Sequence, residues 1–371
     1  MRIGIPREVK NHEYRVAITP SGVHELTRAG HAVYVEEEAG AGSSIADTDY
    51  KAAGASVLRT PEEVWGEADL VLKVKEPVAE EYPRMRAGQT LFTYLHLAAS
   101  RECTEAMLAS GITGVAYETV QPADGSLPLL FPMSEVAGRL APQVGAYHLM
   151  RAAGGRGVLM GGVSGTRPAK VTVIGAGVSG MNAVAVATGM WADVTLLDLD
   201  VAKLRAADRM YQGRITTVAS NAYELERAVK ESDLVIGAVL VPGARAPKLV
   251  TNRMVSGMRP GSVLVDIAVD QGGCCEDSRP TTHADPVYHV HDSLFYCVAN
   301  MPGAVPNTST YALTNVTLPY VLSIAAKGLP AAAQADPALL RGVNVLDGRV
   351  TYRPVAEAHG LEHADAASLL H

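Results

Sequence analysis

The stretch VTVIGAGVSGMNAV, residues 171–184, decides the fold of the central part of the chain. A run of apolar and β-branched residues leads directly into glycines at 175, 177 and 180, which have the G-x-G-x-x-G spacing. Gly175 permits a tight turn, Gly177 lets a pyrophosphate approach the backbone, and Gly180 lets the following helix pack closely on the strand. The unpaired N–H groups at the start of that helix favour an anion. The stretch therefore predicts a dinucleotide-binding βαβ unit.

An acidic residue at the end of the next predicted strand supports this interpretation. The segment DVTLLDLD (193–200) carries Asp198. Such units place the acid that binds a ribose 2′-OH about twenty residues after the first glycine, which is close to the spacing found here. A carboxylate there repels a 2′-phosphate, so we predict NAD as the cofactor; the nearby Lys203 leaves NADP open as an alternative.

Short apolar runs alternate with helical patterns along the whole chain, which is typical of α/β proteins with parallel sheets. Helices are expected over 21–30, over about 134–152 with Pro142 inside, and from about 309 onward. Asp347–Gly348 between two apolar runs predicts a hairpin. Strands are expected over 2–6, 31–37, 69–77, 90–96, 114–120, 170–175, 193–200, 233–241, 262–270 and 296–300.

A chain of 371 residues is too long for one ordinary domain, and the pattern predicts two. We expect two doubly wound domains of parallel strands, the second inserted into the first, with a cleft between them. The substrate domain would comprise 1–130 and 307–371, and the nucleotide-binding domain 131–306.

Composition narrows the function classes. Hydrophobic residues make up 48% and charged residues 19%, so a large core is expected rather than disorder. The net charge of -7 argues against a nucleic-acid partner. No apolar run is long enough to span a membrane, and the N-terminus has no signal region. The four cysteines lack C-x-x-C spacing, so we predict no metal site, free thiols at Cys274–Cys275, and a cytoplasmic protein.

Three chemically capable side chains come at predicted strand ends. Lys75 closes the run LVLKVKEP, His96 closes TLFTYLH, and Asp270 closes VLVDIAVD before a Gln-Gly-Gly loop. Ligands of open parallel sheets bind beyond the carboxyl ends of the strands. A lone histidine in an apolar run is more often structural than catalytic. Together, however, the three residues indicate a site that binds cofactor and substrate in the cleft.

Several stretches together resemble the NAD-dependent L-alanine dehydrogenase family, whose wider group includes the NAD-binding subunit of proton-translocating transhydrogenase and the lysine-forming saccharopine dehydrogenases. The resemblance covers nearly the whole chain. The stretches that carry it are MRIGIPREVKNHEYRVAITP, ADLVLKVKEP, LFTYLHLA, AYETVQ, PMSEVAGRLA, VIGAGVSG and LVDIAVDQGGCCE.

The resemblance implies two Rossmann-like domains and the reversible oxidative deamination of L-alanine to pyruvate and ammonia, with hydride passing from the alanine Cα to the nicotinamide C4. It also implies a homo-oligomer, commonly a hexamer. Carried over to this chain, it makes His96 and Asp270 the catalytic pair and Arg15 and Lys75 the substrate-binding residues. The implied cofactor contacts are Ser134, Gly175, Gly177, Val178, Gly180, Asp198, Lys203, Ser220, Val239, Leu240, Ile267, Arg279, Val298, Asn300 and Met301.

These roles agree with the chemistry of the side chains. The guanidinium of Arg15 offers a fork of donors to a carboxylate, and Lys75 can stabilise negative charge on a carbonyl oxygen. Histidine titrates near neutral pH, as an acid/base group must, so His96 is the main candidate. Asp270 would bind the amino group or orient water. Tyr94 and Met133 are expected to crowd the substrate methyl group, which leaves glyoxylate as a side substrate.

Three other functions stay open at this stage. One is a transhydrogenase-like module that passes hydride to a partner protein, and a second is a non-catalytic NAD sensor. The third is a dehydrogenase for another small 2-amino or 2-oxo acid. The presence of the complete acid/base and substrate-binding set favours the amino-acid dehydrogenase, since fold alone does not fix function.

Overall fold

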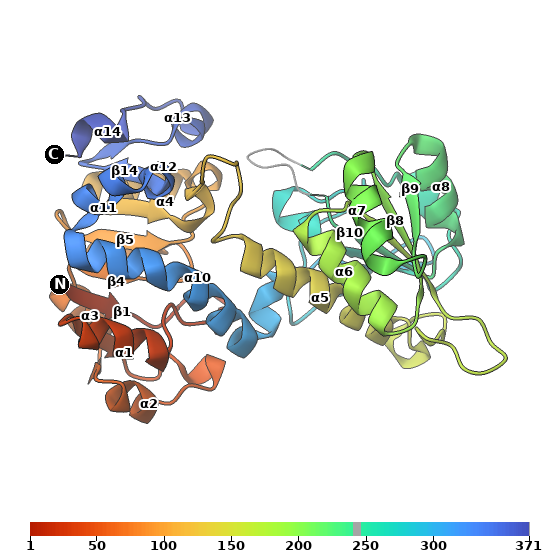
Figure 1. Cartoon of the computed structure of the whole chain (residues 1–371), viewed down its shortest axis with the longest axis horizontal. Coiled ribbons are helices and arrows are strands. Elements are labelled where there is room, and N and C mark those ends of the chain that lie inside the picture. The colour runs from red at the N-terminus through yellow and green to blue at the C-terminus, as the bar shows by residue number, and fades with distance from the viewer. Residues whose placement is uncertain (240–245, 371) are drawn as a thin grey trace. The chain divides into compact units, whose positions relative to one another are not determined.

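A computed structural model describes residues 1–239 and 246–370 (Figure 1). They form two compact units. Unit 1 comprises Met1–Met133 and Val305–His371, and unit 2 comprises Ser134–Ala304. Each unit contains one sheet of mostly parallel strands with helices between them. The predicted fold class, α/β with two Rossmann-like parallel sheets, is therefore confirmed.

The sheet of unit 1 has eight strands in the order β15-β14-β6-β5-β4-β1-β2-β3. Strands β1 to β6 run parallel, and β14 and β15 are added in antiparallel fashion at one edge. The bounds are β1 Arg2–Ile5, β2 Ala32–Glu36, β3 Ser56–Leu58, β4 Leu70–Leu72, β5 Thr90–Thr93, β6 Thr113–Ala116, β14 Val343–Leu346 and β15 Arg349–Val350.

Both faces of this sheet are buried, as strand β4 illustrates. Leu70 and Leu72 belong to one hydrophobic cluster, and Val71 between them belongs to another. Helices α1 and α10 supply the first cluster and α4 and α13 the second, so helices cover both faces. The helices are α1 Pro20–Arg28, α2 Asp47–Ala52, α3 Pro61–Glu67, α4 Arg101–Ser110, α10 Pro306–Lys327, α11 Leu329–Ala335, α12 Pro337–Gly342, α13 Arg353–His359 and α14 Ala366–Leu369.

The sheet of unit 2 has seven strands in the order β12-β13-β11-β10-β7-β8-β9, all parallel except β12. The strands are β7 Lys170–Ile174, β8 Asp193–Asp198, β9 Thr216–Ala219, β10 Leu234–Gly237, β11 Val263–Asp266, β12 Val287–Val290 and β13 Ser293–Tyr296. The helices are α5 Phe131–His148, which contains Pro142, α6 Val178–Gly189, α7 Val201–Tyr211, α8 Ala222–Glu231 and α9 Asn252–Ser256.

Both sheets change winding direction at one point. In unit 1 the chain proceeds outward from β1 through β2 to β3 and then returns to β4 on the other side of β1. In unit 2 it proceeds from β7 through β8 to β9 and returns to β10 on the other side of β7. Open parallel sheets bind ligands beyond the strand ends at such a switch point. The fold therefore directs attention to the segments after β1 and β4 and to those after β7 and β10.

The predicted hairpin near the C-terminus is confirmed. Strands β14 and β15 pair in antiparallel fashion, and the two residues between them have positive φ, 49° at Asp347 and 69° at Gly348. Two consecutive positive φ values are the geometry of the tight turn that a sequence Asp-Gly favours.

Several strands are shorter than predicted, so the prediction that the reactive residues close them was wrong. Strand β4 ends before Lys75, β5 ends before His96, and β11 ends before Asp270, which lies in the 3-10 helix Ile267–Gln271. The cause is side-chain hydrogen bonding: the carboxylate of Asp266, for example, accepts the Ala268 N–H at 3.0 Å and ends the strand. The strand expected over 296–300 ends at Tyr296, and β3, β9 and β12 were not predicted.

Candidate active site

In unit 1 the three candidate residues follow three neighbouring strands. Arg15 comes after β1, Lys75 after β4 and His96 after β5, and these strands are adjacent in the sheet. Because the strands are parallel, all three residues lie in segments beyond the same edge of the sheet, at the switch point. The topology thus brings together the residues that the sequence predicted for substrate binding and proton transfer.

Arg15 is engaged by a carboxylate of the same chain. Its Nε and Nη2 each donate to Glu13 at 2.6 Å, and both side chains are almost fully buried. The third guanidinium nitrogen, Nη1, lies 2.9 Å from the sulfur of Met133. One edge of the guanidinium is therefore occupied by Glu13, and Nη1 is in contact with Met133.

The pKa of Glu13 follows from this pairing. Burial acts to raise the pKa of the carboxyl, but the Arg15 guanidinium and its hydrogen bonds outweigh burial, and the pKa is lowered. The ion pair is therefore maintained at neutral pH. A fixed, charged pair of this kind holds Arg15 in one orientation.

His96 has an unusual backbone conformation that a glutamate stabilises. Its φ and ψ are 46° and 36°, in the left-handed region that few side chains adopt. The carboxylate of Glu118 accepts the His96 N–H at 2.6 Å and also the Leu95 N–H at 3.2 Å. The imidazole Nδ1 lies 3.8 Å from the same carboxylate, and the ring stacks on Tyr94 with centroids 5.9 Å apart. The imidazole is therefore exposed to solvent, while Glu118 and Tyr94 fix the direction in which it points.

Sequence reasoning missed Glu118. The stretch AYETVQ supports both a predicted strand over 114–120 and the family resemblance, and an acid just after a buried strand is the signal that could have identified Glu118. Tyr94, by contrast, was predicted to line the substrate pocket. Its hydroxyl donates to the Leu129 carbonyl at 2.5 Å, and burial raises its pKa, so it stays neutral at physiological pH.

In unit 2 the glycine turn has the geometry that a dinucleotide requires. Gly175 has a φ of 104°, and a Cβ at Gly180 would lie 1.7 Å from the Gly175 carbonyl oxygen. A Cβ at Gly177 would meet nothing within 4 Å. Helix α6 starts at Val178 with no side-chain cap, so its first N–H groups have no side chain of the turn as partner. Gly180 is needed for packing, and Gly177 leaves room for a pyrophosphate.

Asp198 at the end of β8 is tied to the glycine turn. Its Oδ2 accepts the Ala176 N–H at 2.6 Å, and its Oδ1 accepts the Asp200 N–H at 2.8 Å. Each carboxylate oxygen has a second lone pair for a ribose hydroxyl. Ser220 lies beside it, because the Ser220 N–H donates to the Asp198 carbonyl at 2.9 Å. Asp198 therefore fits the role of ribose acceptor and also fixes the turn.

Of the other predicted cofactor residues, Val239 lies beside the glycine turn. Val239 follows β10, and its side chain would lie 3.2 Å from a Cβ on Gly175. Ser134 lies on α5, one turn before Gly138, which packs against the start of α6. Leu240 lies outside the described residues. Lys203 is exposed on α7.

Asp270 contacts the segment that follows β13. Its Oδ2 accepts the Asn300 N–H at 3.2 Å, and Asn300 has a left-handed φ of 57°. The guanidinium of Arg279 lies 4.1 Å from the centroid of the Tyr288 ring, and the backbone N–H of Arg279 donates to the Tyr288 hydroxyl at 2.9 Å. The remaining predicted cofactor residues lie on the segments that follow β11 and β13: Ile267, Val298 and Met301.

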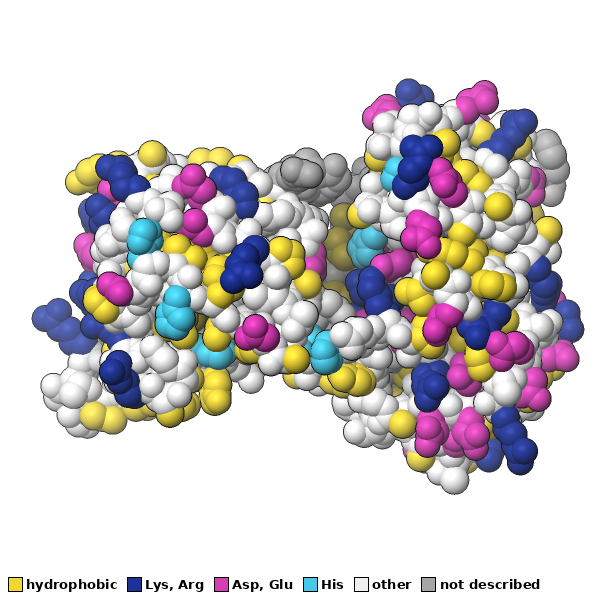
Figure 2. Space-filling view, turned by 180° about the vertical axis from the view of Figure 1, so that it is seen from behind, with side chains coloured by type: hydrophobic (Ala, Val, Ile, Leu, Met, Phe, Trp, Pro, Cys, Tyr) yellow, Lys and Arg dark blue, Asp and Glu magenta, His cyan; other side chains and the backbone are white. Residues whose placement is uncertain are grey.

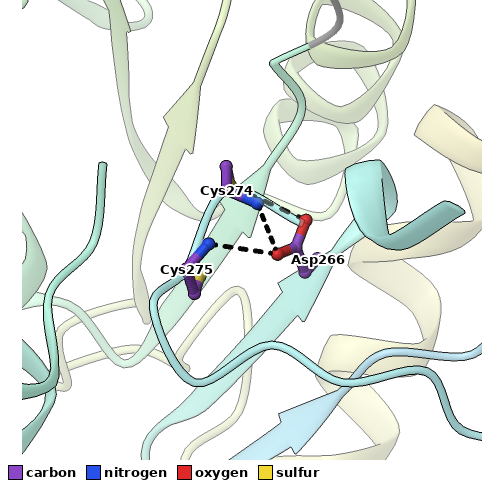
Figure 3. A group of neighbouring side chains, drawn as sticks. All are labelled: Asp266, Cys274 and Cys275. Carbon is purple, nitrogen blue, oxygen red and sulfur yellow. Dashed lines mark hydrogen bonds between the residues drawn. The ribbon is translucent and has the colours of Figure 1, made fainter. Parts of the chain in front are cut away.

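The side chains of Asp266, Cys274 and Cys275 are buried close together (Figure 3). A carboxylate oxygen and the two sulfur atoms, which are possible metal ligands, lie within 4.8 Å of one another. The carboxylate is already saturated with donors, since Asp266 accepts the N–H groups of Cys274 at 2.8 Å and Cys275 at 3.2 Å and the Ser278 hydroxyl at 2.5 Å. The hydrogen bond between the two thiols is the largest influence on each, lowering the pKa of Cys274 and raising that of Cys275; burial and the Asp266 carboxylate act to raise both, and the pKa of each thiol is raised. These hydrogen bonds to Asp266 hold the loop 266–278 in place, which is a structural role.

Charged side chains of both signs intermingle on the face of the molecule that Figure 2 shows, rather than gathering by sign. Among the described residues, no helix is long and apolar enough to cross a membrane. All four cysteines are free and buried.

Comparison with known proteins connects these features to one family. The model of the alanine dehydrogenase/PNT N-terminal domain matches residues 4–137, and that of the C-terminal domain matches residues 141–353. The chain is 64% identical to the alanine dehydrogenase of Mycolicibacterium smegmatis and 56% identical to that of Geobacillus stearothermophilus, covering 100% of both chains in each comparison.

Two solved structures are also similar to this chain over nearly its whole length. A structure of L-alanine dehydrogenase has a TM-score of 0.95 and 50% identity, with 97% of this chain and 99% of that chain covered. A transhydrogenase from Sinorhizobium meliloti has a TM-score of 0.80 and 28% identity, with 95% and 99% covered. By both measures the chain is more similar to the dehydrogenase than to the transhydrogenase.

Proposed function

Since the chain belongs to the alanine dehydrogenase/PNT family and is an oxidoreductase that uses NAD(H), we propose that it catalyses the reversible oxidative deamination of L-alanine to pyruvate and ammonia. The observation that carries this proposal is the placement of Arg15, Lys75 and His96 after three adjacent strands at the switch point of one sheet. A module that only passed hydride to another protein would not need this set.

When bound, NAD would accept the hydride that leaves the alanine Cα. The turn after β7 would hold its pyrophosphate, with Gly177 leaving the space, and Asp198 would accept hydrogen bonds from the ribose. A 2′-phosphate at that position would lie against the Asp198 carboxylate, which supports NAD over NADP.

The side chains of unit 1 bind the substrate and move its protons. The guanidinium of Arg15 pairs with the substrate carboxylate, and Lys75 stabilises negative charge on the carbonyl oxygen of pyruvate. His96 takes a proton from the substrate amino group as deamination begins and returns protons in the reverse direction. Its Nδ1 faces Glu118, which leaves Nε2 for the substrate. Asp270 of unit 2 binds the amino group or orients the water that hydrolyses the imine.

Substrate size follows from the same residues. Met133 lies against Arg15, and Tyr94 is fixed by its hydrogen bond to the chain, so both restrict the space beside the substrate carboxylate. This supports a methyl side chain and makes reductive amination of glyoxylate to glycine a side activity. A homo-oligomer, with a hexamer favoured, and a cytoplasmic location are further parts of the proposal.

The test is the absorbance of NADH when purified protein is mixed with NAD and L-alanine, with L-serine, L-valine and D-alanine as controls. We expect a rise with L-alanine and little with the others. Tight NADH binding without turnover of any amino acid would instead favour a transhydrogenase-like module or an NAD sensor.

A further inference from the structure

We propose that Glu8 is a positioning residue for Lys75, whose backbone it holds in place with a buried carboxylate. The inference rests on the proposed function, because it takes Lys75 to bind the substrate. Glu8 follows β1 and does not belong to the predicted site. It is 9% exposed as a residue, and its carboxylate faces the segment that leaves β4.

That segment continues its contacts with β5 after β4 has ended at Leu72. The Lys73 N–H donates to the Phe92 carbonyl at 3.2 Å, and the Tyr94 N–H donates to the Val74 carbonyl at 3.3 Å. On the side that faces β5, the segment is therefore held by backbone hydrogen bonds of the kind that join parallel strands. On the other side of the same segment, β1 ends at Ile5.

Glu8 takes the place of the missing strand neighbour. The pairing of β1 with β4 ends at Val71. Beyond it, Oε1 of Glu8 accepts the Val74 N–H at 2.6 Å, and Oε2 accepts the Lys75 N–H at 3.4 Å. The Lys75 carbonyl accepts the Thr93 hydroxyl at 3.0 Å on the opposite side. The backbone at Lys75 is therefore fixed from both sides, by β5 and by Glu8.

A buried ion cluster holds Glu8 in turn. Nζ of Lys73 lies 3.2 Å from Glu8 and 2.8 Å from Glu81, and all three side chains are at most 2% exposed. Glu13 and Arg15 are buried nearby, so three carboxylates face two cations. Burial, with Glu13 and Glu81 adding to it and Lys73 opposing, raises the pKa of Glu8 to about 7. Above that pH, Glu8 is a charged acceptor that reaches two N–H groups and one ammonium at once.

The experiment compares Glu8→Gln with Glu81→Gln at pH 8, above the pKa of Glu8. Both variants remove one carboxylate from Lys73, but Glu81 accepts the Val78 N–H instead of those at 74 and 75. We expect Glu8→Gln to raise the KM for L-alanine and for pyruvate about tenfold, because an amide nitrogen would face N–H donors, with NADH affinity unchanged. Glu81→Gln should lower the melting temperature to a similar extent but leave both KM values near those of the wild type.

Glu8→Asp is the second variant, in case the first does not fold. It keeps the charge near Lys73 but shortens the side chain, so it cannot reach both N–H groups. We expect a raised KM with a smaller loss of stability. Equal KM values for Glu8→Asp and the wild type, or equal changes in Glu8→Gln and Glu81→Gln, would overturn the positioning role.

Lys75→Ala separates this inference from the proposed function. If Lys75→Ala keeps the wild-type KM, Lys75 does not bind the substrate and the proposed function loses that residue. If Lys75→Ala is impaired, adding Glu8→Gln should cause no further loss of substrate affinity, because Glu8 affects the substrate only through Lys75. Additive losses would show that Glu8 acts independently of Lys75.

Discussion

At the scale of single residues, buried and half-buried carboxylates explain how the candidate side chains are held. Glu13 occupies one edge of Arg15, Glu118 holds the backbone of His96, and Glu8 holds that of Lys75. Glu8 and Glu13 could not be recognised from the sequence, because a glutamate next to a strand is normally exposed and only the fold shows that these two are buried. Glu118 could have been identified, because it follows an apolar run that is typical of a buried strand. The sequence and its family resemblance named Arg15, Lys75 and His96 as candidates, and the fold places all three in segments that follow adjacent strands.

His96 is the residue whose loss should affect the rate most directly. We expect His96→Ala to lower kcat by about 10² to 10⁴-fold, the usual contribution of a general acid/base group, while NADH affinity stays unchanged. Steady-state kinetics and fluorescence titration with NADH measure the two effects. His289→Ala, on the exposed edge strand β12, is the matched control and should behave as the wild type. Near-normal turnover of His96→Ala would show that another group moves the proton.

Asp198 should determine the choice between NAD and NADP. We expect Asp198→Ala to lower the ratio of kcat/KM for NAD to that for NADP about tenfold or more, because the charge that repels a 2′-phosphate is lost. Asp200→Ala is the control, since Asp200 caps α7 through the Ala202 N–H. It should cost about 1 kcal/mol of stability and leave the cofactor ratio unchanged. An unchanged ratio in Asp198→Ala would contradict the assignment.

At the scale of elements, the sequence predicted correctly the turns whose geometry depends on a few neighbouring residues. The glycine turn after β7 and the Asp347–Gly348 hairpin were identified correctly, because each depends on backbone conformations that few residues adopt. Strand ends were predicted too far along the chain. Strand β4 ends where a side chain, Glu8, replaces a neighbouring strand, and no local pattern reveals such a long-range partner.

Two alanine substitutions in the glycine turn should separate folding from binding. Gly180→Ala places a methyl group against the Gly175 carbonyl, so we expect a large loss of stability. Gly177→Ala meets nothing within 4 Å, so it should fold normally but bind NADH much more weakly, because the methyl group occupies the space of the pyrophosphate. Thermal unfolding and NADH titration measure both effects. Normal NADH affinity in Gly177→Ala would place the pyrophosphate elsewhere.

At the scale of the whole molecule, the two units have the same organisation. Each is a parallel sheet with a switch point, and candidate residues lie in the segments that follow the strands there. The alternation of strands and helices along the sequence predicted this architecture, because both faces of each sheet must be buried. The antiparallel strand β12 was not predicted, and its mixed burial gives it the weak pattern of an edge strand.

The stability of the whole chain should depend on pH through Glu8. Burial is the main cause that raises its pKa from 4.5 to about 7, so the folded state binds this proton more tightly than the unfolded state. Its contribution is therefore fully present below pH of about 4.5 and is lost as the pH rises through 7. Relative to Glu8→Gln, the wild type should lose on the order of a few kcal/mol between pH 5 and pH 8. Urea unfolding of both proteins at the two pH values measures this difference, and a constant difference would show that Glu8 titrates normally.

The central claim is that hydride leaves the Cα of L-alanine for NAD. The most direct measurement supplies L-alanine deuterated at Cα, together with NAD, and analyses the reduced nucleotide by mass spectrometry. The proposed reaction predicts that one deuterium appears in the nicotinamide ring and that pyruvate and ammonia form in equal amounts. Reduced nucleotide without deuterium, or no reduction of NAD by alanine, would contradict it.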